Sequence, residues 1–244
     1  MIHTPRLLSV TALPLGGGLV AFDAAAALGL AGVQLDAADP SMRPRELGES
    51  ARRDVAAALR RRGLACSGVD CLVPAERFQD PARVERALEA VHGALELAEA
   101  LGRVAVCVQL PEAHTDSTLH LQAEACRRGV PLADITVRAP TGSVCVDPAA
   151  WLAASIDVPS GVASLGPRVA AARVVDLLRS GLRGPIGEPG AARLDAMAYR
   201  LALEVAGFQG LPVIDARQWA DAPSQVARCA ERWAHLLPAL GGAA

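Results

Sequence analysis

The feature that most constrains the fold is a regular alternation of short apolar runs with longer amphipathic stretches. The apolar runs have the length of strands and lie at residues 7–13, 32–37, 67–73, 103–110, 134–138, 143–147, 169–176 and 211–216. Helical periodicity occurs between and after them, at residues 50–62, 81–101, 117–128, 195–206 and 224–237. This alternation is typical of parallel strands joined by crossover helices. Eight strands in 244 residues therefore predict an α/β fold, a single (β/α)8 TIM barrel that forms one domain over residues 1–244.

One segment departs from this alternation. Only Ala139, Pro140, Thr141 and Gly142 separate the fifth predicted strand from the sixth. A crossover between parallel strands usually takes about a dozen residues or more, so no helix fits here. We expect the barrel to be trimmed between strands five and six, where the chain either returns as a short extended link or forms a local hairpin.

The composition excludes several kinds of chemistry. The sequence contains no Lys and no Asn, so all 24 basic side chains are Arg. Without Lys there is no Schiff base, no pyridoxal phosphate aldimine and no lysine-type phosphate loop, and without Asn there is no N-glycosylation site. The 24 basic and 26 acidic residues leave a net charge of -2, and no basic patch is interleaved with aromatic residues. We therefore predict no cofactor and no nucleic-acid partner.

The sequence also favours a cytoplasmic protein. Its N-terminal segment has one early cation, Arg6, and its apolar run is interrupted by Thr11 and Pro14, which makes a poor signal peptide. No apolar run reaches the 18 residues or so that a membrane span needs, so no membrane partner is expected. The six cysteines are scattered without a Cys-x-x-Cys pair, and three of them lie in apolar runs where a thiol is usually a small buried hydrophobe. The oligomeric state is not predicted by any of these features.

Five segments carry a resemblance to a known family. In chain order they are LGLAGVQLD (28–36), RRGLACSGVD (61–70), FQDPARVERALEAVHGALELAEALG (78–102), VCVDPAAWLAASIDVPSGVASLGPRVAAARVVDL (144–177) and AGFQGLPVIDAR (206–217). With them the chain resembles the xylose isomerase-like TIM barrels, which include sugar-phosphate isomerases and epimerases and the endonuclease IV group of AP endonucleases. The likeness covers nearly the whole chain, and the order of the segments is more specific than any one of them.

The resemblance implies a site at the ends of strands five to eight, where enzymes of this family typically hold a divalent metal with Glu, Asp, His and Glu. The corresponding positions in this sequence are Arg138, Asp147, Arg173 and Asp215. A guanidinium keeps its proton and has no lone pair for a metal. Two carboxylates and two guanidiniums have no net charge, so we expect Arg138 and Arg173 to pair with Asp147 and Asp215 and no metal to be bound.

Further candidates follow other strands. Gln109, Glu112 and His114 come after the fourth strand, where Glu112 and His114 are candidates for proton transfer and Gln109 for substrate binding; a solvated polar loop is the alternative. Asp176 resembles the Asp of the family's His-x-x-Asp motif and is a candidate substrate ligand or a salt-bridge residue at the rim. Asp36 and Asp70 either bind sugar hydroxyls or cap the loops that follow them.

Two functions remain open. The first is a non-catalytic member that binds a small sugar, sugar phosphate or sugar acid, with Arg138 and Arg173 as its anion site if the aspartates leave them free. The second is an active, metal-independent isomerase or epimerase that uses Glu112, His114, Asp147 and Asp215. An abasic-site endonuclease is not expected, because that chemistry needs a His-rich metal cluster and the five His residues do not match it.

Overall fold

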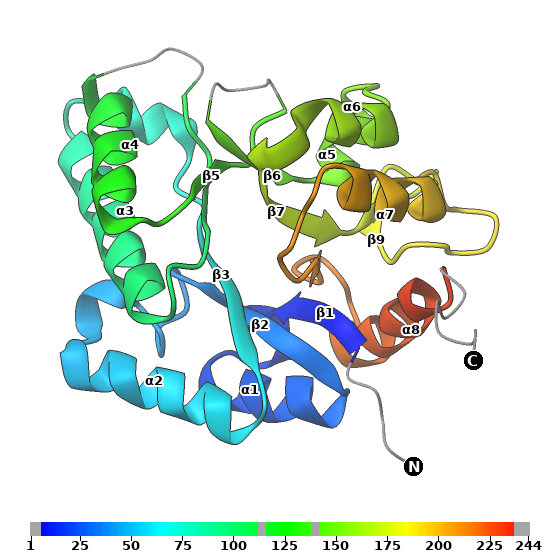
Figure 1. Ribbon diagram of the computed structural model, residues 1–244, viewed down its shortest axis with the longest axis horizontal. Coiled ribbons are helices and arrows are strands. Elements are labelled where there is room, and N and C mark those ends of the chain that lie inside the picture. The colour runs from blue at the N-terminus through cyan, green and yellow to red at the C-terminus, as the bar shows by residue number, and fades with distance from the viewer. Residues whose placement is uncertain (1–5, 112–115, 138–141, 237–244) are drawn as a thin grey trace.

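The computed structural model describes residues 6–111, 116–137 and 142–236, and its central feature is a closed barrel of eight parallel strands (Figure 1). Around the barrel the strands follow the order β1-β10-β7-β6-β5-β4-β3-β2. Their bounds are β1 Arg6–Thr11, β2 Leu30–Asp36, β3 Ala65–Cys71, β4 Val106–Val108, β5 Leu132–Asp134, β6 Ser143–Val146, β7 Val169–Val174 and β10 Val213–Ile214. The predicted TIM barrel is therefore confirmed.

The helices pack around the outside of this barrel (Figure 1). They are α1 Gly18–Ala27, α2 Glu49–Arg61, α3 Val84–Ala100, α4 Asp116–Arg128, α5 Pro148–Ala153, α6 Val158–Leu165, α7 Ala196–Val205 and α8 Ala222–Ala234, with short 3₁₀ turns η1 Leu13–Leu15, η2 Pro44–Glu46, η3 Ala75–Phe78 and η4 Gly166–Arg168. The five predicted helices are present. The sequence analysis missed α1, whose residues are almost all apolar and give no helical period, and the two short helices α5 and α6. In the described part of the chain, no helix combines the length and apolar character that a bilayer crossing requires.

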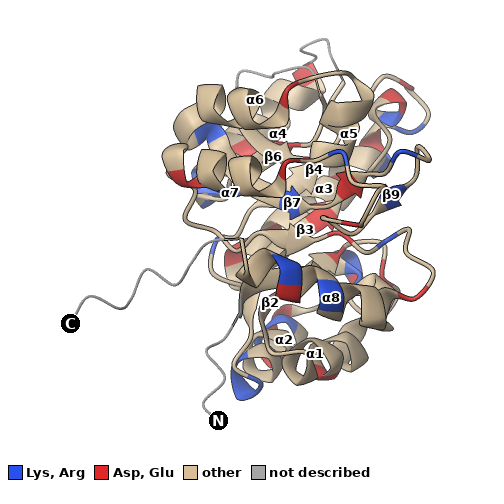
Figure 2. Cartoon of the chain, turned by 90° about the vertical axis from the view of Figure 1, so that its right-hand side faces the viewer, with Lys and Arg blue, Asp and Glu red and all other residues tan. Residues whose placement is uncertain are grey.

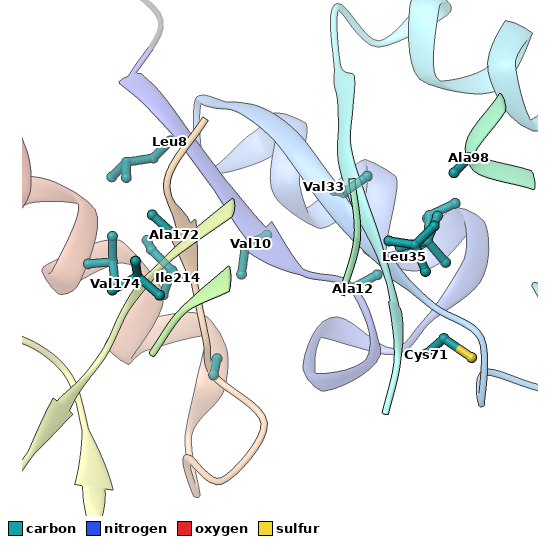
Figure 3. Packing of buried hydrophobic residues seen from close by; sticks show 14 of the residues in the cluster. Leu8, Val10, Ala12, Val33, Leu35, Cys71, Ala98, Ala172, Val174 and Ile214 are labelled. Carbon is teal, nitrogen blue, oxygen red and sulfur yellow. The ribbon is translucent and has the colours of Figure 1, made fainter. Parts of the chain in front are cut away.

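The main core lies between the barrel strands and the helices. Side chains alternate along each strand, and the outward ones, such as Leu8, Val10, Leu35 and Ile214, are at most 1% exposed (Figure 3). Because both faces of the strands are buried, they read as nearly continuous apolar runs in the sequence. This explains why the strands could be located from the sequence.

The inside of the barrel is different. Its apolar residues form a separate cluster of small side chains, namely Ala105, Cys107, Ala133, Cys145 and Ala171. Barrel interiors are usually filled by bulky branched residues. Here the interior also holds Arg173 of β7, which is the largest fully buried side chain among the described residues. The small neighbours leave room for this long side chain inside the barrel.

The pairing of β5 with β6 decides between the two predicted alternatives, a short extended link and a local hairpin. The strands pair in parallel, with Ala133 opposite Ser143, so the chain returns as a short link and the predicted hairpin is wrong. Among the described residues of this link, 135–137 and 142, none is helical. The fifth strand itself lies earlier than predicted, because the Asp134 carboxylate accepts hydrogen bonds from the backbone N of Thr136 at 2.9 Å and from its hydroxyl at 3.0 Å and turns the chain there.

A small antiparallel hairpin follows β7. Its strands are β8 Asp176–Leu177 and β9 Arg183–Gly184, and the predicted seventh strand, 169–176, spans β7 and the start of β8. The turn contains Gly181, whose φ of 82° lies in the left-handed region that favours glycine. The hairpin folds the chain back so that Arg183 returns to the end of the barrel.

Candidate functional site

Six charged side chains meet at the C-terminal end of the barrel, the end that carries the active site in barrels of this kind. Figure 2 shows acidic and basic segments next to one another around β7 and β9. Three carboxylates and three guanidiniums alternate in this cluster, which we call the Arg–Asp chain; in order of contact its members are Asp147, Arg183, Asp215, Arg217, Asp70 and Arg173.

The outer part of the Arg–Asp chain is built on Arg183. Its Nη1 donates hydrogen bonds to both carboxylate oxygens of Asp147, at 3.1 and 2.9 Å, and its Nη2 donates to Oδ2 of Asp215 at 2.9 Å. Asp147 follows β6 and is also the N-cap of α5, where it accepts a hydrogen bond from the backbone N of Ala150 at 3.2 Å. Arg183 therefore bridges the two aspartates that the resemblance placed in a metal site.

Arg217 continues the Arg–Asp chain from the loop after β10. Its Nε and Nη2 donate to the two oxygens of Asp215 at 2.8 and 2.6 Å, which is the bidentate geometry that a guanidinium prefers with a carboxylate. Its Nη1 lies 3.7 Å from Oδ2 of Asp70. The carboxylate of Asp215 is thus held by two guanidiniums at once.

The inner part of the Arg–Asp chain is the pair of Arg173 and Asp70. Nη2 of Arg173 donates to Oδ1 of Asp70, and their side chains are only 0% and 2% exposed. Asp70 also accepts a hydrogen bond from Nε2 of Gln34 at 2.8 Å, and the Oε1 of Gln34 accepts one from Ser67 at 3.3 Å. Tyr199 donates its hydroxyl to the backbone O of Arg173 at 2.9 Å. This buried polar network fixes the Arg–Asp chain from below.

These contacts favour the charged forms of Asp215 and Arg173. Burial alone would raise the pKa of Asp215, but the hydrogen bond from Arg217 and the charges of Arg173, Arg217 and Arg183 outweigh it and hold the pKa well below its usual value. Burial opposes the charge of Arg173, yet the nearby Asp70 and the other negative groups raise the pKa of its guanidinium. With three charges of each sign, the Arg–Asp chain as a whole is neutral.

This pairing differs from the predicted one. Asp147 and Asp215 are indeed paired with arginines, but the partners are Arg183 and Arg217, and Arg173 binds Asp70 instead. The reason is position: Asp70 is opposite Cys107 on the adjacent strand and points into the barrel, where Arg173 also lies. The carboxylate of Asp70 is therefore engaged by side chains, and among the described residues it does not cap the loop after its strand, which was one of the two alternatives.

Three of the predicted site residues, Glu112, His114 and Arg138, lie outside the described residues. Asp176 is fully buried and accepts hydrogen bonds from the backbone N of Arg193 at 3.1 Å and of Leu194 at 2.9 Å, so it stabilises the loop after the hairpin. The rim salt bridge considered for it is not formed among the described residues.

A pocket of about 740 Å³ opens above the Arg–Asp chain. Its wall includes Gln109, Asp147, Arg183, Arg217 and Gln218, with Leu110 and Ile135 as apolar neighbours. The structure thus brings the predicted residues Gln109 and Asp147 together at one opening, which we call the mouth. Arg173, Asp70 and Asp215 are buried at 0–2% exposure and do not line it.

The sequence analysis missed Arg183 and Arg217. Arg217 stands two residues after Asp215, and a charged side chain at that distance from a strand-end carboxylate was a usable signal. No local pattern marks Arg183, because its place depends on the hairpin that carries it back to the barrel.

The fold and the position of the site define an eight-stranded parallel barrel with a charged pocket at the C-terminal ends of its strands. Residues 22–134 match the family model of the xylose isomerase-like TIM barrels. The predicted resemblance to this family is therefore confirmed over that range. No curated protein matches the chain.

Solved structures of this fold cover nearly the whole chain at low identity. A xylose isomerase domain protein from Planctomyces limnophilus is 15% identical with a TM-score of 0.73, over 96% of this chain and 98% of that one. D-Allulose 3-epimerase from Methylomonas sp. in complex with D-allulose is 14% identical with a TM-score of 0.70, over 94% and 96%. The IOLI protein with a bound zinc atom is 13% identical with a TM-score of 0.69, over 94% and 95%. At such identities these neighbours establish the fold alone.

Proposed function

We propose that this protein is a xylose isomerase-like barrel that binds a small sugar acid, sugar phosphate or sugar in its mouth without a divalent metal and without turning it over. The observation that carries this proposal is the bridge from Arg183 to both Asp147 and Asp215. A guanidinium occupies the place between two carboxylates where relatives in this family are expected to hold a metal ion.

The residues present do not fit a divalent cation. Among the described residues, no three His, Cys, Asp or Glu side chains are grouped so that they could hold a metal ion. Both oxygens of Asp147 and both of Asp215 already accept hydrogen bonds from guanidiniums. A metal would have to displace Arg183 and Arg217, and it would add two positive charges to a neutral cluster. We therefore do not expect this chain to bind zinc as the IOLI protein does.

The mouth has the chemistry of an anion and hydroxyl site. Arg183 and Arg217 line it with side chains that are 21% and 22% exposed, so their remaining N–H groups are accessible to a carboxylate or phosphate. Gln109 and Gln218 offer amide donors and acceptors for hydroxyl groups. The volume of about 740 Å³ is ample for a molecule of the size of D-allulose, the sugar in one structural neighbour. Arg138 and Arg173, the anion ligands expected from the sequence, are replaced in this proposal by Arg183 and Arg217.

The alternative, a metal-independent isomerase, is less well supported by the chemistry of the aspartates. A general base works best when its pKa lies near the working pH. Burial alone would raise the pKa of Asp215, but its arginine partners outweigh that effect and hold the pKa well below the usual value. The oxygens of Asp147 are occupied by Arg183 and by the N-cap contact. The geometry therefore favours binding over proton transfer.

Ligand-induced thermal shifts test the proposal. We expect aldonic acids and sugar phosphates to raise the melting temperature of the wild-type protein and of Arg62→Gln, which removes a surface guanidinium away from the mouth. Arg183→Lys keeps the charge but loses the bidentate fork, and it should reduce the shift severalfold. Metal analysis of the purified protein should find no stoichiometric dication. Turnover of a ketose that is abolished by Asp147→Ala would overturn the non-catalytic reading, and a bound dication would overturn the metal-free one.

A further inference from the structure

A second groove leaves the mouth sideways and runs between the loops after β2 and β3 and the outer face of α3. Its inner part, about 560 Å³, is lined by the strand ends of β2 and β3, and its outer part, about 370 Å³, lies over α3. The two parts share Arg45, Arg77 and Arg86, and the inner part shares Leu72 and Arg217 with the mouth. We call this continuous depression the lateral groove.

The lateral groove concentrates positive charge. Six guanidiniums line it, against the two carboxylates of Asp36 and Glu89; the guanidiniums belong to Arg43, Arg45, Arg77, Arg83, Arg86 and Arg217. Four of these guanidiniums pair with carboxylates that do not line the groove: Arg43 and Arg45 with Glu46, Arg83 with Asp80, and Arg217 with Asp215. The other two belong to Arg77 and Arg86. Charge of one sign in a concave surface attracts ligands of the opposite sign.

Two of these guanidiniums have no internal partner. Among the residues that the structure describes, the side chains of Arg77 and Arg86 make no hydrogen bond or ion pair, although both line the inner and the outer part of the groove. A neighbouring groove lined by α2, α3 and α4 holds four arginines, of which three pair with glutamates: Arg52 with Glu96 at 2.8 Å, Arg128 with Glu99 at 2.7 Å, and Arg53 with Glu49. In the lateral groove the two unpartnered guanidiniums both line the wall that its inner and outer parts share.

Apolar side chains lie between these guanidiniums. They belong to Val73, Ala82, Ala87 and Ala90, and η2 and η3 both contact α3 beside them. A guanidinium recognises the oxygens of a phosphate bidentately. A groove of this size admits a phosphate group and a few attached carbons.

We propose that the lateral groove binds the phosphate group of a phosphorylated small molecule through Arg77 and Arg86, while the rest of that molecule extends past Arg217 toward the mouth. The second half of this proposal rests on the proposed function, because it names the phosphate monoester as the ligand class of that same site. The first half, a phosphate site in the groove, stands on the groove alone.

Isothermal titration calorimetry with three ligands tests both halves: inorganic phosphate, a sugar acid, and the phosphate monoester of that same sugar acid, which is the sugar phosphate of the comparison. The double variant Arg77→Gln/Arg86→Gln should weaken binding of inorganic phosphate and of the sugar phosphate at least tenfold and leave the sugar acid unaffected. The matched control Arg60→Gln/Arg61→Gln removes two exposed guanidiniums from the end of α2 and should change none of the three.

The outcomes separate the groove from the mouth. If Arg77→Gln/Arg86→Gln binds phosphate as the wild type does, or if the control loses as much affinity, the lateral groove is not a phosphate site. If phosphate binding depends on Arg77 and Arg86 but no sugar acid binds and Arg183→Lys has no effect on the sugar phosphate, the groove stands and the proposed function of the mouth fails. The full proposal is supported if the sugar phosphate binds more tightly than phosphate or the sugar acid, and if Arg77→Gln/Arg86→Gln and Arg183→Lys each weaken its binding.

Discussion

Replacing Arg173 by Met tests whether the buried pair at the base of the Arg–Asp chain neutralises Asp70. Met has a similar stem without the charge, so the space inside the barrel stays largely filled. The variant leaves the carboxylate of Asp70 buried at 2% exposure, with Gln34 at 2.8 Å and Arg217 at 3.7 Å as its remaining partners. An uncompensated charge in such a place is strongly destabilising.

The magnitude follows from the burial. Removing one partner of a buried ion pair typically costs about 3–5 kcal/mol. Because Arg217 still neutralises part of the charge of Asp70, we expect a loss at the lower end of this range, about 3 kcal/mol of unfolding free energy. For a protein of this length that corresponds to a fall of about 6–12 °C in melting temperature. The double variant Arg173→Met/Asp70→Asn removes both charges, so it should be clearly more stable than Arg173→Met alone.

Urea unfolding followed by circular dichroism measures these free energies. The matched control is Arg62→Met, since Arg62 also pairs with an aspartate, Asp23, at 2.7 Å, but on the surface. Exposed pairs contribute about 0–1 kcal/mol, so this variant should be nearly neutral. If Arg173→Met costs no more than Arg62→Met, or if adding Asp70→Asn restores nothing, the account of the Arg–Asp chain as mutual charge compensation is refuted.

Three further predictions concern the same network. Asp215→Asn should be less stable than the wild type at pH 7, and the difference in unfolding free energy should shrink as the pH falls below about 4. The reason is that the depressed pKa of Asp215 gives stability that is present above the pKa of the unfolded state and is lost toward acid. A difference that stays constant with pH in the unfolding measurements would contradict this prediction. Gly68→Ala should cost about 1–3 kcal/mol in urea unfolding, because a Cβ there would lie 2.8 Å from the carbonyl O of Ala105 and 2.9 Å from Oε1 of Gln34; a neutral variant would show that the interior yields. Tyr199→Phe should cost about 1 kcal/mol by removing the hydrogen bond to the backbone O of Arg173, and a larger thermal-shift loss than that of Arg173→Met would be inconsistent with this role.

Part of the candidate site was predictable from single residues. Asp147 and Asp215 follow apolar runs, so their position at the C-terminal ends of strands could be read from the sequence, and both are held by arginines in the structure. The identity of those arginines was not predictable. Arg173 was expected to meet Asp147 or Asp215, yet the barrel places it beside Asp70, which lies 103 residues earlier.

For the lateral groove, too, the sequence predicted less than the structure shows. The sequence contains many arginines, and their number alone says nothing about which of them find partners. In the part of the chain that the structure describes, the side chains of Arg77 and Arg86 make no ion pair, whereas Arg52 pairs with Glu96. An ion pair depends on distances of a few ångströms, which periodicity does not encode.

The sequence by itself determined the barrel, its strand order along the chain and the short length of the link between β5 and β6. Apolar periodicity and segment length are local properties, which burial on both faces of a parallel strand imposes directly. Tertiary structure alone decided which guanidinium neutralises which carboxylate. Closing the barrel brings Asp70 and Arg173 together inside it, and the β8–β9 hairpin returns Arg183 to bridge Asp147 and Asp215. The electrostatics of the site therefore come from contacts between segments far apart in the chain.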